Sequence, residues 1–210
     1  MKLRDKLLEL RNVSVPLEKM EFDSKLLNLW KNKRNYSILI DSDASDFIKG
    51  IIIDKVKIRT NRFFGEAYVA VKTPMTQGWY SSYQWLRWKG GDGGLWITGK
   101  GLKQGKNESK NYKQIFYDQF ILEIVGVENL SYLHDCSKIF QNGDTKTKNY
   151  PKAPDLSIVD KKGNLMFIEV KLPNDEFDSL QENGLKMIKK YLKTKNNHPV
   201  FVKKVKLIPS

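Results

Sequence analysis

Residues 154–181 read PDLSIVDKKGNLMFIEVKLPNDEFDSLQ, and this stretch decides the fold. Two apolar segments within it, residues 156–159 and 166–171, have the length and composition of buried strands. The residues between them, 160–164, read DKKGN, which is typical of a hairpin turn. The stretch therefore predicts an antiparallel pair of strands.

Three charged residues lie within or beside these strands, where apolar residues are expected. Side chains alternate between the two faces of a strand, so Glu169 and Lys171 lie on one face. Hairpin pairing brings Asp155, at the start of the first strand, next to the end of the second. Two converging carboxylates repel each other unless they are paired or bind a cation. We therefore expect Asp155, Glu169 and Lys171 to form one site.

The chemistry of this trio favours a metal ion and a phosphate substrate. Mg²⁺ suits one or two carboxylates together with waters and phosphate oxygens, and Mn²⁺ is a second candidate. A neighbouring lysine can orient a water or offset charge that develops on a phosphate. The trio indicates metal-assisted phosphodiester hydrolysis. A purely structural ion pair between Glu169 and Lys171 is the alternative.

A helix is predicted from Asp178 to about Lys193. Asp178 begins it as an N-cap, and Gln181, three residues later, completes the spacing of a capping box. Apolar residues recur at helical spacing on the face that carries Gln181, namely Leu185, Ile188 and Leu192. Gln181 is therefore expected to point toward the end of the Glu169 strand. It acts there either as a cap alone or as a ligand of a metal-bound water or a phosphate.

The pattern Pro154-Asp155 followed by Glu169-Val170-Lys171 resembles the PD-(D/E)XK nuclease superfamily. The continuation IEVKLPNDEFDSLQ is similar to the virus-type replication-repair nuclease family (VRR-NUC), in which a Pro-Asn-Asp loop and a helix carrying a Gln follow the strand. Archaeal Holliday-junction resolvases share the core motif. The resemblance covers residues 107–207 and is strongest over 153–192. It implies metal ligands at Asp155 and Glu169, the catalytic lysine at Lys171 and a supporting amide at Gln181.

The same resemblance implies one more acidic residue, carried by a helix that precedes the first core strand. We expect this helix at residues 109–125. Its early positions hold no Glu, and the candidates on its inward face are Gln114 and Asp118. Glu66, arriving from elsewhere in the chain, is the alternative.

The balance of charge favours a polyanionic partner. The chain has 37 Lys and Arg against 24 Asp and Glu, a formal net charge of +13, which attracts DNA through counterion release. Much of the excess lies on the exposed side of the final helix and in the alternating strand that follows it, residues 200–208. The candidate DNA-binding residues on the helix are Lys186, Lys189, Lys190 and Lys193. A merely solvated basic face is the alternative.

The 210-residue length suits one domain with a sizeable extension. No segment resembles a membrane span and the N-terminus is charged throughout, so we expect an intracellular, cytoplasmic protein. Cys136 is the single cysteine, which excludes an internal disulfide. The aromatic stretch 63–97, interleaved with Lys and Arg, is interpreted either as a surface for stacking bases or as core and dimer interface.

The predicted fold class is α/β, a restriction-endonuclease-like core with a central mixed β-sheet flanked by helices. Residues 107–210 form this nuclease core, and residues 1–106 form an N-terminal α+β extension that binds DNA or dimerises. The predicted function is Mg²⁺-dependent endonucleolytic hydrolysis of DNA. By resemblance, the substrate is branched, flap or junction DNA and the protein is a homodimer. The alternatives are a non-catalytic DNA-binding protein that retains the fold and a restriction-type, sequence-specific endonuclease.

Overall fold

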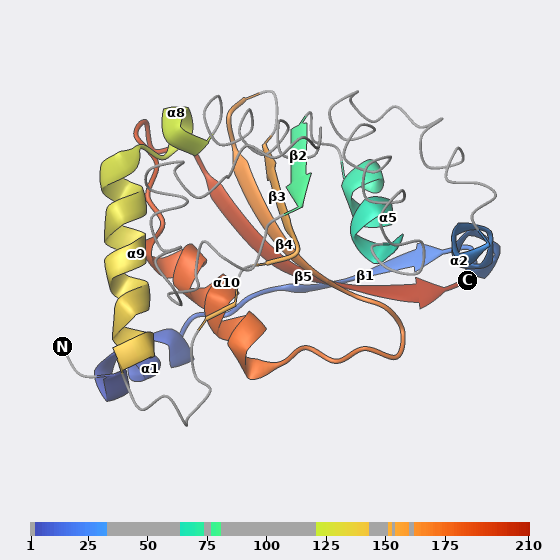
Figure 1. Ribbon diagram of the computed structural model, residues 1–210, viewed down its shortest axis with the longest axis horizontal. Helices are drawn as coiled ribbons and strands as arrows, with labels where there is room; N and C mark the ends of the chain where they lie inside the picture. The colour runs from blue at the N-terminus through green and yellow to red at the C-terminus, as the bar shows by residue number, and fades with distance from the viewer. Residues whose placement is uncertain are drawn as a thin grey trace.

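The central sheet takes its strands from both halves of the sequence (Figure 1). The computed structural model describes residues 3–32, 64–73, 77–80, 121–142, 151–152, 154–159 and 162–210. The five strands in these ranges are β1 (Leu17–Phe22), β2 (Gln77–Tyr80), β3 (Leu156–Val159), β4 (Leu165–Lys171) and β5 (Val200–Pro209). They form one sheet in the order β1-β5-β4-β3-β2. β2, β3 and β4 are antiparallel neighbours, whereas β5 runs parallel to both β4 and β1.

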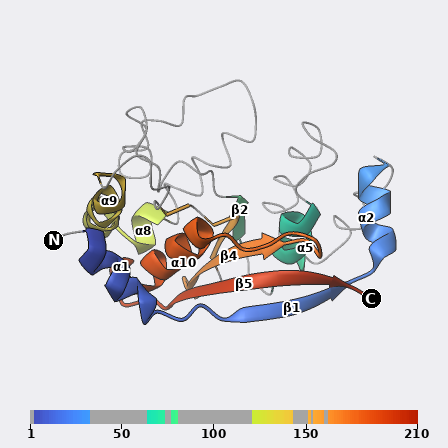
Figure 2. The same ribbon diagram turned by 90° about the horizontal axis from the view of Figure 1, so that it is seen from below.

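The helices form two groups, which the two views of the molecule show at its two ends (Figures 1 and 2). One group comprises α1 (Leu3–Arg11), α9 (Val127–Asn142) and α10 (Ser179–Tyr191), and the short α8 (Leu122–Ile124) leads into α9. The other comprises α2 (Ser24–Lys31) and α5 (Phe64–Lys72). α10 is the crossover that the parallel pair β4 and β5 requires. The predicted α/β class, an open mixed sheet flanked by helices, is confirmed.

The hairpin of β3 and β4 forms where the sequence predicts it. Leu156 pairs with Ile168 and Val159 with Leu165 in antiparallel register. In the turn, Gly163 has φ of 79°, a conformation that glycine adopts without a steric penalty. One further step in the same register places Asp155 opposite Glu169, which fixes the position of the candidate site.

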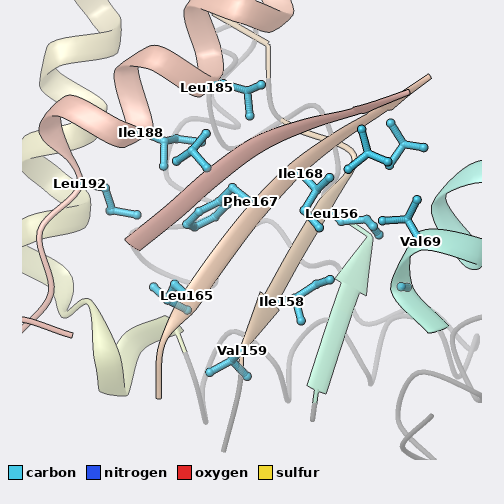
Figure 3. Packing of buried hydrophobic residues seen from close by; sticks show 14 of the residues in the cluster. Val69, Leu156, Ile158, Val159, Leu165, Phe167, Ile168, Leu185, Ile188 and Leu192 are labelled. Carbon is cyan, nitrogen blue, oxygen red and sulfur yellow. The ribbon is translucent and has the colours of Figure 1, made fainter. Parts of the chain in front are cut away.

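The core lies on both faces of the sheet because β3 and β4 are apolar on both faces. Phe167 lies on the side of α10, whereas Ile168 lies on the side of α5, where Val69 is buried (Figure 3). α5 packs closely because Gly65 has no side chain: a Cβ there would lie 3.1 Å from Val170 Cγ1. Burial on both faces explains why these strands read as continuous apolar runs.

The N-terminal segment is bound to the sheet and to α10. β1 pairs with β5 from Leu17 to Phe22. Lys189 Nζ donates to the Ser14 carbonyl at 2.8 Å, and the Tyr191 hydroxyl donates to the Glu9 carboxylate. Residues assigned to an N-terminal extension therefore belong to the same sheet as the motif. The boundary expected at residues 106 and 107 lies outside the described residues.

Several sequence expectations fall outside the described residues. They include most of the helix expected at 109–125, with Gln114 and Asp118, and most of the aromatic stretch 63–97. Within the described ranges, no helix combines the length and the apolar character needed to cross a membrane.

Candidate active site

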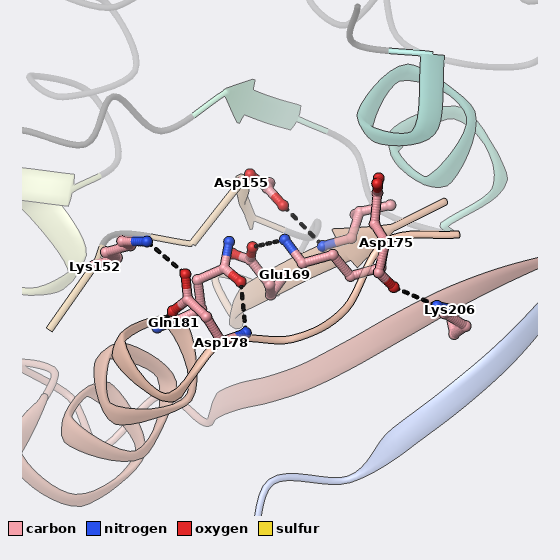
Figure 4. Close-up of polar contacts among 9 residues, drawn as sticks. Lys152, Asp155, Glu169, Asp175, Asp178, Gln181 and Lys206 are labelled. Atoms are coloured by element: carbon pink, nitrogen blue, oxygen red, sulfur yellow. Dashed lines mark hydrogen bonds and ion pairs between the residues drawn. The ribbon is translucent and has the colours of Figure 1, made fainter. Parts of the chain in front are cut away.

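Asp155 and Glu169 lie together at the end of β4 (Figure 4), and Lys171 joins them through its contact with Glu169. The backbone N–H of Val170 donates to Asp155 Oδ2 at 2.9 Å and holds that carboxylate beside the strand. Lys171 Nζ donates to Glu169 Oε1 at 2.7 Å. The alternation of side chains along β4 thus brings the lysine and the glutamate onto one face, and the hairpin register adds the aspartate.

Glu169 is fully buried, with 0% of its surface exposed. Lys171 satisfies Oε1, but no hydrogen-bond donor among the described residues reaches Oε2. An unsatisfied buried acceptor costs about 1–3 kcal/mol, so its presence calls for an explanation. The pKa of Glu169 is raised to about 9. Burial is the larger cause, and the neighbouring Asp155 carboxylate is the second. Burial also raises the pKa of Asp155, although the Val170 N–H and Lys171 oppose the rise. The pair therefore retains a proton at neutral pH unless a cation replaces it.

These residues fit a hard divalent cation. Both side chains offer oxygen ligands only, and Glu169 Oε2 is a buried acceptor beside a second carboxyl group. Mg²⁺ prefers such oxygens and keeps several waters of its own, so two protein carboxylates suffice as a partial ligand set. Over the described ranges, no three His, Cys, Asp or Glu side chains come close enough together to hold a metal ion.

Two further acidic residues belong to segments that pack near this end of the sheet. Asp175, in the loop between β4 and α10, acts electrostatically on both Asp155 and Lys171. Glu66 lies in the first turn of α5, next to Gly65. Gly65 packs against Val170 and Leu172, the two residues that flank Lys171 in the sequence. Sequence reasoning named Glu66 only as an alternative and missed Asp175.

Gln181 serves as part of the helix cap. The Gln181 side-chain Oε1 accepts from the backbone N–H of Asp178 at 3.1 Å. The backbone N–H of Gln181 donates to Asp178 Oδ1 at 2.8 Å, which completes the predicted capping box. The same side chain points from the first turn of α10 toward Glu169 (Figure 4). An amide whose oxygen is engaged in a cap still has its NH₂ group to donate. The geometry is therefore compatible with both roles that the sequence left open.

The segment that leads into Asp155 is docked on α10. The Lys152 N–H donates to the Leu180 carbonyl at 3.0 Å, and its side chain forms an ion pair with Asp178. A Cβ on Gly184 would lie only 1.8 Å from the Lys152 carbonyl oxygen. A glycine inside a helix is unfavourable by about 1 kcal/mol relative to alanine, so its presence at 184 was the available signal of this close contact.

Two lysines of β5 join the site through the sheet register. Lys204 pairs with Glu169, and Lys206 pairs with Lys171. The Phe177 ring lies 5.8 Å from Lys171 Nζ and 5.5 Å from Lys204 Nζ, so both lysines project from the same face. Sequence reasoning predicted the alternating strand but not its register, and so placed neither lysine at the site.

The lysines of α10 that were predicted to bind DNA contact other parts of the protein. Lys186 forms an ion pair with Glu182 at 3.0 Å, while Lys189 and Lys190 donate to carbonyls of the N-terminal segment. Lys193 is exposed. Their binding to DNA stays a prediction.

Comparison with known proteins adds no relative. No family model matches the chain, and no match was found among curated proteins or among solved structures. The resemblance to PD-(D/E)XK nucleases therefore rests on the residues of the sequence motif alone.

Proposed function

We propose that this chain is a Mg²⁺-dependent deoxyribonuclease with a restriction-endonuclease-like core, of the PD-(D/E)XK superfamily and most like VRR-NUC enzymes. The observation that carries the proposal is the buried Glu169, whose Oε2 has no donor among the described residues while Asp155 lies beside it and Lys171 binds Oε1. In the metal-free protein a proton shared between the hydrogen-bonded Asp155 and Glu169 removes the repulsion of the two carboxylates, and a metal ion on this pair would take the place of that proton.

In this mechanism Asp155 and Glu169 would hold the metal. Mg²⁺ or Mn²⁺, when bound, supplies a water of lowered pKa and positive charge near the phosphate. The Val170 N–H fixes the orientation of Asp155. Burial lowers the pKa of Lys171, but the nearby Glu169 and Asp155 carboxylates raise it more, so the side chain stays charged. It positions the attacking water or stabilises the charge that develops on the phosphate.

The order of elements supports this assignment. The family resemblance implies an acidic residue on a helix ahead of the core strands. In the structure α5 precedes the antiparallel strands β2, β3 and β4 and carries Glu66 in its first turn. Glu66 is a candidate for the third acidic group and Asp175 is the second choice, but neither comes within metal reach of Asp155 and Glu169 in this structure. The other candidates, Gln114 and Asp118, lie outside the described residues.

The proposal is tested with labelled duplex, single-stranded, flap and four-way DNA, incubated with Mg²⁺ or with a chelator. By resemblance we expect preferential cutting of branched or flap DNA, dependent on Mg²⁺. Lys171→Ala should lower the rate by about 10²–10³-fold, the range seen when one group that stabilises transition-state charge is removed. Lys171→Met, which keeps most of the apolar stem, controls for loss of packing.

Metal-independent cutting at equal rates by wild type and Lys171→Ala, or no cutting of any substrate, would contradict the proposal. The rival is a non-catalytic DNA-binding protein that retains the fold. Salt-sensitive DNA binding without any cutting would support that rival.

Gln181→Glu separates the two roles of Gln181. Glutamate at this position still accepts from the Asp178 N–H and so keeps the capping box, but it loses the NH₂ donor and adds charge beside Glu169. If the amide supports catalysis, we expect cleavage to fall at least about tenfold while the denaturation midpoint changes little. Unchanged cleavage would assign Gln181 to the cap alone.

A further inference from the structure

We propose that Lys19, Lys204 and Lys206 form a phosphate-binding row on the sheet, which holds the DNA backbone next to the phosphate that is cut. We call these three residues the lysine row. The proposal rests on the proposed nuclease function, because it takes the Glu169 site as the place of cutting. It adds a path for the DNA strand across β5 and β1 that does not depend on the lysines of α10.

The pairing of β5 with β4 and β1 brings the lysines of the row together. Lys206 of β5 pairs with Lys171 of β4 on one side and with Lys19 of β1 on the other. Lys204 pairs with Glu169. Paired residues of neighbouring strands project from the same face, so a line of cations runs outward from the site.

Contacts on the two faces confirm which side the row occupies. Phe22, three residues after Lys19, lies against Phe64 of α5, with ring centroids 5.5 Å apart, so Lys19 projects from the opposite face. Lys203, adjacent to Lys204 in β5, also projects away from the row and pairs with Glu18 at 2.7 Å. Lys203 is therefore a matched control on the same strand.

The present partners of the row are weak enough for a phosphate to replace them. Lys206 contacts the Asp175 carbonyl and lies 4.0 Å from the carboxylate of Glu176, a side chain that is 92% exposed. Lys204 lies 3.7 Å from Glu182, which it shares with Lys186. Exposed ion pairs contribute only about 0–1 kcal/mol, so little stability is lost when the Glu176 carboxylate moves aside. Glu182 is partly buried, but it keeps its shorter ion pair with Lys186 when Lys204 turns to a phosphate.

The spacing of the row suits a nucleic-acid backbone. Neighbouring strands lie about 4.8 Å apart, so Lys171 and Lys19 are separated by about 10 Å across β5. One DNA strand advances about 3.4 Å per phosphate along the helix axis, so the span from Lys171 to Lys19 corresponds to about three phosphate steps. The net charge of +13 attracts the same ligand over longer distances.

The test measures DNA binding without cutting, by fluorescence anisotropy of a labelled duplex in EDTA from 50 to 200 mM KCl. The full-length variants are Lys206→Gln, Lys19→Gln and the control Lys203→Gln. Each row variant should lower the slope of log affinity against log salt by about one unit and weaken binding at 50 mM KCl by about three- to tenfold. Lys203→Gln should leave the slope unchanged. Thermal melting of each variant checks that the fold is retained.

Slopes for Lys206→Gln and Lys19→Gln that match Lys203→Gln, or a wild type that does not bind DNA at 50 mM KCl, would overturn the proposal. The proposed function fails in a different way. If the row variants lower the slope but wild type cuts no DNA with Mg²⁺, the lysine row stands and the nuclease assignment falls. If wild type cuts and the row variants bind and cut as wild type does, the nuclease assignment stands and the lysine row falls.

Discussion

Glu169 links the charge state of the site to the stability of the fold. Its carboxyl group is buried beside that of Asp155, and Lys171 occupies only one of its two oxygens. A buried carboxyl group in this setting avoids ionisation by keeping a proton. On the proposed function, a metal ion bound there would displace that proton, so pH, metal and folding would be coupled through one side chain.

The metal-free protein should lose stability as pH rises from about 5 to 9. Burial raises the pKa of Glu169 from an ordinary 4.5 to about 9. Between these values the folded protein keeps a proton that the unfolded chain releases, so the free energy of unfolding falls with rising pH. The slope should be on the order of 1 kcal/mol per pH unit at its steepest. Urea unfolding in EDTA at several pH values measures it.

Glu169→Gln is the matched control because the amide has the same shape and does not titrate. Its stability should depend less on pH over the same window than that of wild type. Added Mg²⁺ should stabilise wild type more at pH 9 than at pH 6, since the carboxylates must be deprotonated to bind it. Equal slopes of unfolding free energy against pH for wild type and Glu169→Gln would show that folding does not raise the pKa of Glu169.

At the scale of elements, the site depends on how the chain ahead of β3 is fixed to α10. Gly184→Ala tests this contact. Alanine ordinarily favours a helix over glycine by about 1 kcal/mol, but here its Cβ would lie 1.8 Å from the Lys152 carbonyl oxygen. We expect a loss of about 1–3 kcal/mol in unfolding free energy and slower cleavage, because the segment before Asp155 is displaced.

Asn183→Ala, one residue earlier on the same helix, is the control and should change stability by no more than about 0.5 kcal/mol. Urea unfolding and the cleavage assay are run on both variants. A Gly184→Ala protein as stable and as active as Asn183→Ala would mean that the Lys152 segment moves aside without consequence.

The elements that the sequence predicted well are those with local signals. The turn around Gly163 and the alternation in β4 indicate the hairpin, and Asp178 with Gln181 indicates the start of α10. Glu66, the proposed third acidic group, has no local signal of this kind. α5 is buried along most of its length, so it lacks the polar face that marks an amphipathic helix, and its Glu66 lies within an apolar run.

Partners that are distant in the sequence could not be predicted, because strand register is decided by packing rather than by neighbouring residues. Lysines alternate along β5, but nothing near them in the sequence indicates that Lys206 lies between Lys171 and Lys19. Lys189 and Lys190 are exposed, as the sequence predicts, but nothing near them in the sequence indicates that they donate to carbonyls of the N-terminal segment.

At the scale of the whole molecule, the motif strands are covered by segments from the first half of the chain. β1 pairs along β5, β2 pairs with β3, and α5 packs over the face that holds Ile168 and Val170. The hairpin that carries the motif is therefore an internal part of a sheet whose two edge strands, among those described, both lie before residue 106.

A fragment of residues 107–210 should consequently fail to fold cooperatively. It contains the whole motif but lacks β1, β2 and α5, together with the buried side chains of Phe22, Trp30 and Phe64. Burial of each such side chain contributes about 1.5–3 kcal/mol, so their loss is comparable to the roughly 5–15 kcal/mol by which a domain is stable. Thermal melting followed by circular dichroism compares the fragment with the full chain. An equimolar mixture with residues 1–106 that regains a cooperative transition would show that only the missing strands and helix were at fault. A sharp transition in the fragment alone would instead establish an independent C-terminal core.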